Sequence, residues 1–391
     1  MNRLSVSLFV LALAACGNGD GSDAGPVDVD MAIAPDLLPP LRDPGAHPPQ
    51  AMITSNGGRV LKNPEIITIV WSGDALGQKR QQFADWLVTS DYFKTTMVDF
   101  GIGAGTTQPL VTITDPPPAT FDESSVGPFL RAHFADGTIP PPNVNSLYVF
   151  YTPKATTPTM NGSRACSGGW LGYHSVTLSG EPPPAPSHVP FAIVPACSKG
   201  AGEFLEDTDT ASHEIAEAAT DPEITAWMDN AQPLSEVGDL CNDLRLSYAV
   251  TLPDGSSTQF SVQRIWSPSI AASGSGDPCV PTPGNGYIWF NAGVVPFAPI
   301  INTDANGKGT TTFLIEPFAQ GNVGTISWII TDGPATGVRF STTQGKGVAG
   351  STQSVTITVS ATAQPGNYPL SLVAYDNAGQ SNVWWGYYVV N

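Results

Sequence analysis

The spacing of apolar residues predicts a mixture of strands and helices over the first two thirds of the chain. Residues 65–71 (EIITIVW) and 146–151 (SLYVFY) are short apolar runs, which are typical of buried strands. Further strands are expected at 110–114, 173–178 and 191–194, helices at 78–100, 122–134 and 205–219, and a hairpin where 248–252 and 258–266 flank a Pro-Asp-Gly-Ser turn. These patterns predict an α+β domain over residues 50–283.

The helical period is lost from about residue 286. Short apolar segments there are separated by Gly, Pro and Asn, which favour turns. Residues 354–359 (SVTITV) place branched apolar side chains on one face and threonines on the other, as a strand with one buried face requires. Residues 286–391 are therefore expected to form an all-β, immunoglobulin-like sandwich.

The first residues have the pattern of an export signal. Arg3 precedes an apolar run over 4–13, which is too short to span a bilayer. The ending Leu-Ala-Ala-Cys16 resembles the bacterial lipoprotein box, which implies that residues 1–15 are removed and that Cys16 is acylated. Gly17 after the cysteine favours the outer membrane as the destination. Residues 16–49 are rich in Asp and Pro and are expected to form a disordered tether.

Four cysteines remain after Cys16, and they are Cys166, Cys197, Cys241 and Cys279. An even number in an exported protein predicts two disulfides. Of the three pairings, Cys166 with Cys197 and Cys241 with Cys279 is favoured, because each bond then encloses a turn-rich loop. Zinc binding by the four thiolates is the alternative, but the chain has no Cys-x-x-Cys pair.

Composition excludes several classes of protein. The 391 residues include 34 Asp and Glu against 16 Lys and Arg, so the formal net charge is -18. Nucleic-acid binding requires a basic patch, so no nucleic-acid partner is expected. The 40 Gly and 37 Pro, with only 13% charged residues, exclude a helical bundle or coiled coil.

One segment carries a recognisable chemical pattern, His213-Glu214-Ile-Ala-Glu217 within the helix expected at 205–219. His213 and Glu217 are four residues apart, so their side chains lie on one face of the helix and can reach one ion. Glu214 lies about 100° round the helix, where it can reach a water beside that ion. Zinc peptidase helices of the His-Glu-x-x-His kind use this geometry. A carboxylate at the fifth position lowers the Lewis acidity of the ion, and a solvated acidic helix face would show the same spacing.

Further landmarks follow the same order as in a known family. They are Gly57 to Leu61, Gly172 to Ser175, His213 to Glu217 with Thr220-Asp221-Pro222, Glu236 to Cys241, and Arg264 to Ser267. Together they resemble the phosphate-induced, or Exordium-like, proteins of plants and their bacterial relatives, over residues 57–281. The resemblance implies a zincin-like metallopeptidase domain and a secreted or cell-surface location. The activity of that family is poorly defined.

The resemblance to zinc peptidases also implies roles for single residues. His213 and Glu217 would be metal ligands and Glu214 the general base. Glu236 lies 19 residues after Glu217, close to the spacing of a third glutamate ligand in gluzincin peptidases, and is the first choice for that ligand. Asp239 would be the third ligand or a carboxylate that orients His213.

Three other residues are alternatives for completing the site. Glu223 stands ten residues after His213, which is the metzincin spacing of a third ligand, and Asp221 is also near. His174 would either complete the metal site or stabilise an oxyanion, and as a purely structural residue it would be a histidine at the end of a core strand.

The sequence supports two functional hypotheses. The first is a lipid-anchored bacterial surface protein with a zinc-dependent, peptidase-like domain that acts on a protein or peptide. The second is a non-catalytic surface module that binds protein or glycan. In a third, structural interpretation no metal binds at all. In each case Cys16 would attach the chain to the membrane.

Overall fold

The computed structural model describes residues 48–391, except 169, 199, 230–235, 243, 275, 285, 333 and 334. The predicted signal peptide, the lipidation site at Cys16 and nearly all of the tether lie outside the described residues. Within the described part of the chain, none of the helices is both long enough and apolar enough to cross a bilayer.

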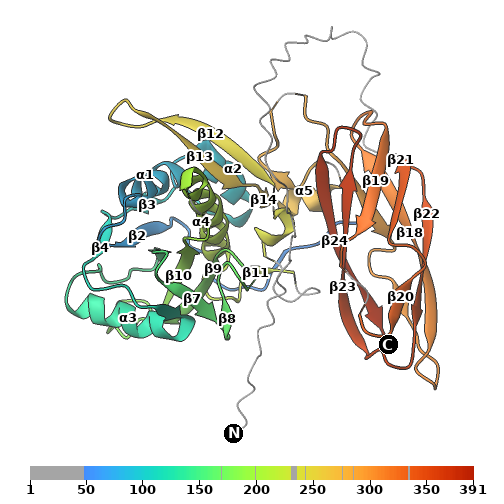
Figure 1. Ribbon diagram of the computed structural model, residues 1–391, viewed down its shortest axis with the longest axis horizontal. Helices are drawn as coiled ribbons and strands as arrows, with labels where there is room; N and C mark the ends of the chain where they lie inside the picture. The colour runs from blue at the N-terminus through green and yellow to red at the C-terminus, as the bar shows by residue number, and fades with distance from the viewer. Residues whose placement is uncertain are drawn as a thin grey trace.

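A six-stranded sheet forms the centre of the first part of the chain (Figure 1). Its strands are β2 (Glu65–Trp71), β3 (Thr106–Thr107), β4 (Val111–Ile113), β6 (Ser146–Thr152), β9 (Tyr173–Leu178) and β10 (His188–Pro195). The order is β3-β2-β6-β10-β9, and β4 also pairs with β2. All ladders are parallel except that of β9, which runs antiparallel to β10 at the edge. The strands expected at these positions are confirmed.

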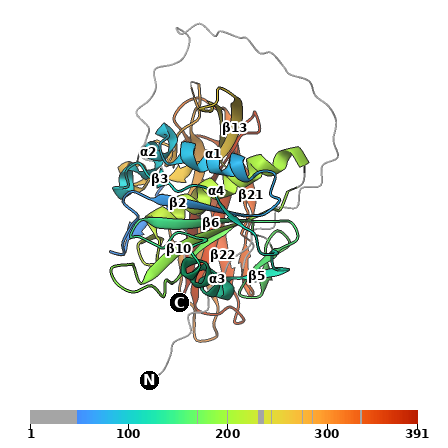
Figure 2. The same ribbon diagram turned by 90° about the vertical axis from the view of Figure 1, so that its left-hand side faces the viewer.

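Helices cover both faces of this sheet (Figure 2). On one face lie α1 (Gly77–Leu87), α2 (Asp91–Met97) with the short η2 (Val98–Phe100), and α4 (Glu203–Thr220), and on the other lies α3 (Glu123–Ala135). Successive side chains of a strand point to opposite faces of the sheet and so pack against different helices. In β2, Ile66 and Val70 pack in the cluster that contains α1, α2 and α4, while Ile67 and Ile69 pack with α3. A strand covered on both sides is apolar on both faces, which explains the nearly continuous apolar run EIITIVW.

The helical pattern predicted over 78–100 is interrupted between α1 and α2. The side chains of Thr89 and Ser90 bond back to carbonyls of the last turn of α1 and compete with its continuation. Ser90 then accepts a hydrogen bond from the backbone N–H of Phe93 and so caps α2. Asp122 caps α3 in the same way.

Smaller elements surround the main sheet. They are β1 (Thr54–Ser55) with β11 (Trp227–Met228), β5 (Thr120–Asp122) with β7 (Thr157–Met160) and β8 (Ser163–Arg164), the hairpin β12 (Arg245–Thr251) and β13 (Ser257–Gln263), β14 (Ile265–Trp266) with β15 (Cys279–Val280), the short helices η3 (Gly200–Gly202) and η4 (Asp239–Cys241), and α5 (Pro268–Ser273). The predicted hairpin is confirmed.

Two packed sheets make up the C-terminal part. One has the order β16-β18-β22-β20 and the other β17-β24-β23-β19-β21. Their bounds are β16 (Phe290–Val295), β17 (Ile300–Ile301), β18 (Gly309–Ala319), β19 (Thr325–Ile330), β20 (Val338–Phe340), β21 (Gln344–Val348), β22 (Gln353–Val359), β23 (Gly366–Tyr375) and β24 (Ser381–Val390). Their inner faces share one core, in which Trp328 and Trp384 are almost fully buried. This is the β-sandwich that the alternating pattern predicts.

The sandwich contacts the first part of the chain through β24 (Figure 1). The indole nitrogen of Trp385 donates a hydrogen bond to the carbonyl of Leu240 at 3.1 Å, and its ring packs against the core that contains α4. The indole nitrogen of Trp384 bonds to the carbonyl of Pro49 at 2.8 Å. The two neighbouring tryptophans of β24 therefore attach the sandwich both to the Leu240 segment and to the first described residues of the chain.

The predicted fold class is wrong. The expectation was an α+β, zincin-like metallopeptidase domain followed by an immunoglobulin-like sandwich. The chain is mostly β, with 38% of its residues in strands and 19% in helices, and the described residues show no zincin-like α+β domain. The physical reason is that the His213 to Glu217 pattern defines one helix, and a single helix does not determine the sheet on which it packs.

Both predicted disulfides are confirmed. They join Cys166 to Cys197 and Cys241 to Cys279, across 31 and 38 residues. Because such bonds persist only in oxidising surroundings, they place the chain in an extracytoplasmic compartment.

Candidate metal site

Helix α4 is fastened to strand β13 by two side chains that lie one helical turn apart. The hydroxyl of Thr208 accepts a hydrogen bond from the backbone N–H of Ser261 at 3.1 Å. The hydroxyl of Ser212 accepts one from the backbone N–H of Gln263 at 2.9 Å. One turn of helix thus matches two residues of strand, and this register brings Gln263 beside His213.

His213 is oriented by Gln263. The Nδ1 atom of His213 lies 3.1 Å from Oε1 of Gln263, whose Nε2 donates to the carbonyl of Gly238 at 2.6 Å. The amide oxygen can only accept, so Nδ1 of His213 is the donor and carries a proton. The other ring nitrogen, Nε2, then faces Oε1 of Glu217 at 3.1 Å, where either a second proton or a cation is required.

Glu217 directs its two oxygens at two different histidines. Oε1 lies 3.1 Å from Nε2 of His213 and accepts a hydrogen bond from the backbone N–H of Gly238 at 3.2 Å. Oε2 lies 3.4 Å from Nδ1 of His174. The Glu217 side chain is only 5% exposed, so the carboxylate is buried between the two rings.

His174 comes from the edge strand β9, opposite Ala192 of β10. Its Nδ1 also lies 3.8 Å from Oε2 of Glu214. Its Nε2 lies 3.5 Å from Oε1 of Glu236, and both of these buried atoms lack a hydrogen-bond partner in the described structure. A buried polar atom without a partner is costly, and the His174 side chain is only 3% exposed.

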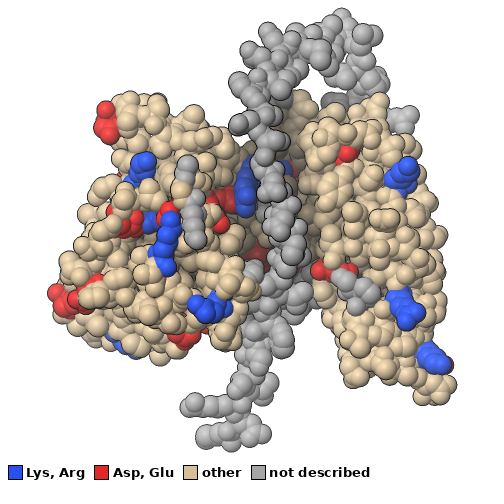
Figure 3. Space-filling model, in the orientation of Figure 1, with Lys and Arg blue, Asp and Glu red and all other residues tan. Residues whose placement is uncertain are grey.

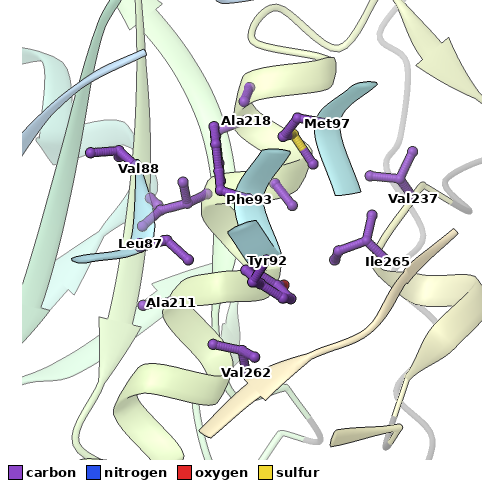
Figure 4. Packing of buried hydrophobic residues seen from close by; sticks show 14 of the residues in the cluster. Leu87, Val88, Tyr92, Phe93, Met97, Ala211, Ala218, Val237, Val262 and Ile265 are labelled. Atoms are coloured by element: carbon purple, nitrogen blue, oxygen red, sulfur yellow. The ribbon is translucent and has the colours of Figure 1, made fainter. Parts of the chain in front are cut away.

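The segment that carries Glu236 and Asp239 is fixed by its neighbours. Val237 is fully buried and packs near Ile265, and its carbonyl accepts a hydrogen bond from the backbone N–H of Trp266 at 2.8 Å (Figure 4). The backbone N–H of Glu236 donates to Oδ2 of Asp239 at 3.2 Å. Asp239 is 43% exposed, and its Oδ1 lies 3.8 Å from Nε2 of His213, so it stands at the mouth of the site.

Two glycines allow the backbone to lie directly against the carboxylates. A Cβ at Gly238 would lie 2.7 Å from Nδ1 of His213 and 2.8 Å from Oε1 of Glu217. A Cβ at Gly172 would lie 2.7 Å from Oε1 of Glu214. Any larger residue at either position would have to displace a side chain of the site.

The electrostatics of the site are dominated by its carboxylates. Burial alone would lower the pKa of His174, but Glu236, Glu214 and Glu217 raise it well above its usual value. His213 behaves likewise, since Glu217 and Glu214 outweigh its burial. Burial raises the pKa of Glu214 and of Glu236, whereas at Glu217 the two histidines outweigh burial and lower the pKa. In the absence of a cation the cluster therefore retains protons.

The structure brings together all six residues that the sequence analysis placed in the site, namely His174, His213, Glu214, Glu217, Glu236 and Asp239. Two groups of them could hold a metal ion. The alternatives for a third ligand are engaged elsewhere. Glu223 forms a salt bridge with Arg59, and Oδ1 of Asp221 accepts the backbone N–H groups of Thr225 and Ala226 at 2.6 and 2.7 Å. The other oxygen of Asp221, Oδ2, is buried without a hydrogen-bond partner among the described residues, and the carboxylate interacts electrostatically with His174.

Sequence reasoning missed Gln263, Gly238 and Gly172. Both glycines lie within landmarks of the family resemblance, so a search for small residues beside His174 and Asp239 would have found them. Gln263 belongs to no motif, and only the register between α4 and β13 brings it to His213.

The face of the molecule drawn in Figure 3 shows no comparable concentration of charge among its visible described residues. On the face shown in Figure 3, acidic and basic side chains are sparse and scattered among uncharged residues, and the visible described residues form no basic patch. The expected absence of a nucleic-acid partner stays a prediction.

No protein-family model and no curated protein matches the chain, so the resemblance to the Exordium-like family stays a prediction. Among solved structures, WR4, a member of the MSP family from C. elegans, is 12% identical over 26% of this chain and 97% of its own, with a TM-score of 0.21. The PapD-like domain 7 of human CEP192 is 12% identical over 30% and 96%, with a TM-score of 0.20. OgpA from Akkermansia muciniphila is 9% identical over 85% and 93%, with a TM-score of 0.22. These likenesses are too weak to support any inference about function.

Proposed function

We propose that the protein is a metal-dependent hydrolase, with a divalent cation bound between His213, Glu217 and their neighbours. The observation that carries the proposal is the convergence of two histidines and several buried carboxylates. Nε2 of His174, within this cluster, has no hydrogen-bond partner among the described residues. Imidazole nitrogen combined with carboxylate oxygen suits zinc, which we propose as the ion. The hydrogen bond between Gln263 and His213 supports this choice, because metal-binding histidines are commonly oriented by such a partner.

The neighbouring residues supply the remaining chemistry. When bound, a divalent cation polarises a substrate carbonyl and lowers the pKa of a water molecule. Glu214 would accept a proton from that water, since burial raises the pKa of its carboxyl and makes it a stronger base than an exposed glutamate. His174, whose Nδ1 lies 3.8 Å from Oε2 of Glu214, would orient that carboxylate.

A peptide is the substrate class that the site favours. Among the described residues, β9 is the last strand of its sheet and pairs only with β10, and it carries His174. An extended peptide can add to such an edge by main-chain hydrogen bonds, and this would bring a peptide bond next to Glu214. Leu171, 41% exposed beside Gly172, offers an apolar contact for a substrate side chain.

The proposed location combines the disulfides with the N-terminal pattern. We propose that Cys16 carries lipid and holds the protein at the outer membrane of a bacterium. Labelled palmitate should be incorporated by the natural protein and not by Cys16→Ser. Release of an unlabelled natural protein into the medium would contradict the anchor.

Glu214→Gln is the decisive variant for the catalytic proposal. The full-length protein, purified in detergent, should contain zinc by elemental analysis and should cleave members of a peptide library followed by mass spectrometry. Glu214→Gln should reduce cleavage by about 100-fold or more and leave the zinc content unchanged, because only the proton acceptor is lost.

Glu206→Gln is the matched control, since Glu206 lies on the same helix two turns before Glu214 and outside the site. It should retain both metal and cleavage. A protein that binds zinc but cleaves no peptide, before or after Glu214→Gln, would instead be the non-catalytic binding module.

A further inference from the structure

We infer that the site holds two divalent cations, which share Glu217 as a bridging ligand. The inference rests on the proposed function for its first cation and adds a second one.

The candidate residues fall into two sets with one member in common. The first set is His213, Glu214 and Glu217, and the second is His174, Glu217 and Glu236. In the first set His213 and Glu217 would bind the ion, while Glu214 would contact the water beside it. In each set one ligand atom per residue lies within 4.8 Å of the others, which is compact enough to surround one ion. Glu217 belongs to both sets.

The orientation of Glu217 matches a bridging role. Oε1 faces Nε2 of His213 at 3.1 Å, and Oε2 faces Nδ1 of His174 at 3.4 Å. Two-metal hydrolytic sites hold their ions about 3.5–4 Å apart, a separation that the two oxygens of one carboxylate can span.

The second set contains atoms that the first cation would leave unsatisfied. Nε2 of His174 and Oε1 of Glu236 are 3.5 Å apart, buried, and without hydrogen-bond partners in the described structure. A cation beside His213 does not reach this pair through the first set of ligands. A second cation, held by one nitrogen of His174 together with Glu217 and Glu236, would compensate the burial of these groups.

Charge balance points the same way. The four carboxylates of Glu214, Glu217, Glu236 and Asp239 carry four negative charges when all are ionised, and the two histidines are neutral as ligands. One divalent cation leaves two of these four charges uncompensated in a largely buried cluster to which Asp221 adds a fifth carboxylate, whereas two cations compensate all four.

A bridging position also gives a reason for glutamate at position 217. An imidazole binds a metal through one nitrogen only, whereas a carboxylate has two oxygens to share. A bridging carboxylate shares its negative charge between two cations. Glu217 would therefore lower the Lewis acidity of each cation by less than if it were bound to a single one. The two ions could then stabilise both the attacking and the leaving group of a hydrolysed bond.

Metal stoichiometry tests the inference. The full-length protein would be stripped with a chelator and titrated with Zn²⁺ by calorimetry, with elemental analysis of the loaded product. We expect two equivalents per chain. One equivalent would overturn the second cation and leave the proposed function intact, while no binding would overturn both.

Variants and a spectrum assign the two ions. Glu236→Gln and His174→Ala should each reduce the stoichiometry from two to one, and His188→Ala, on the same sheet outside the site, should retain two. Circular dichroism would verify that each variant is folded, and Glu236→Gln, which keeps the size of the side chain, decides the assignment if His174→Ala unfolds.

With Mn²⁺ as the probe, the electron paramagnetic resonance spectrum should show coupling between two ions. Two uncoupled ions, or two equivalents retained in Glu236→Gln, would overturn the shared site.

Discussion

Helix α4 carries two buried acidic clusters, and they differ in how their charge is compensated. In its first half, Asp207 lies 2.6 Å from the guanidinium of Arg80, which also pairs with Asp74. In its second half, Glu214 and Glu217 form ion pairs only with histidines among the described residues, none of which pairs them with a lysine or arginine. The first cluster contains its own cation, whereas the second requires protons or a cation from outside.

The contrast separates a structural cluster from a functional one. Arg80 is 3% exposed, and its guanidinium stacks on the ring of Tyr151 with 4.8 Å to the ring centre, so its position is fixed by packing as well as by charge. The carboxylates around His174 and His213 have no fixed cation, which leaves room for exchangeable ions. An acidic cluster is informative about function only after its internal counter-charges have been identified.

The largest effect should come from removing the internal cation. Arg80→Met should lower the free energy of unfolding by about 3–5 kcal/mol, because Asp207 and Asp74 are left buried without a counter-charge. Urea denaturation would measure the loss. Lys94→Met is the control, since Lys94 forms an exposed pair with Asp91 and should cost at most about 1 kcal/mol. If Arg80→Met and Lys94→Met lost equal amounts of unfolding free energy, Arg80 would not be a special internal counter-charge and the contrast between the two clusters would fail.

Metal removal should affect only the second cluster. If zinc is present at about 10 times the Kd of each of the two ions, chelation should lower the free energy of unfolding by about 3 kcal/mol. The same treatment should change nothing in a Glu217→Ala variant, which has lost the shared ligand. Denaturation curves with and without chelator measure both effects. An undiminished response in Glu217→Ala would place the stabilising ion somewhere else.

Local patterns were sufficient to predict the elements and part of the site. The apolar run of β2 and the i, i+4 spacing of His213 and Glu217 depend only on neighbours in sequence, and both predicted elements are present. The disulfides could be paired because each closes a short loop.

Long-range packing could not be predicted in this way. Arg80 pairs with Asp207 across 127 residues, and Gln263 reaches His213 across 50 residues through the register of β13 against α4. The fold class was wrong for the same reason, since the helical motif contains no information about the order of the strands beneath it.

Crowding at Gly238 should perturb the second cluster with an intermediate effect. Gly238→Ala would put a Cβ against His213 and Glu217, and overpacking of this kind costs about 1–3 kcal/mol. Gly202→Ala is a matched control, because Gly202 has a φ of -81° against -80° at Gly238 and a Cβ there meets nothing within 4 Å. Zinc affinity and thermal stability should fall in the first variant and not in the second. Equal behaviour of the two variants would mean that the close approach at Gly238 is unimportant.

The smallest expected effect distinguishes positioning from ligation. Gln263→Ala removes the acceptor for Nδ1 of His213 and should weaken zinc binding about 10- to 100-fold, or about 1.4–2.7 kcal/mol, without reducing the number of ions bound. Gln259→Ala, at an exposed position of the same strand, should leave the affinity unchanged. Gln263→Glu should restore part of the affinity, because a carboxylate also accepts the Nδ1 proton. The opposite outcome would be a loss of zinc affinity in Gln263→Ala that Gln263→Glu does not restore at all. Gln263 would then act by holding Gly238 in place, because its amide N–H also donates to the carbonyl of Gly238.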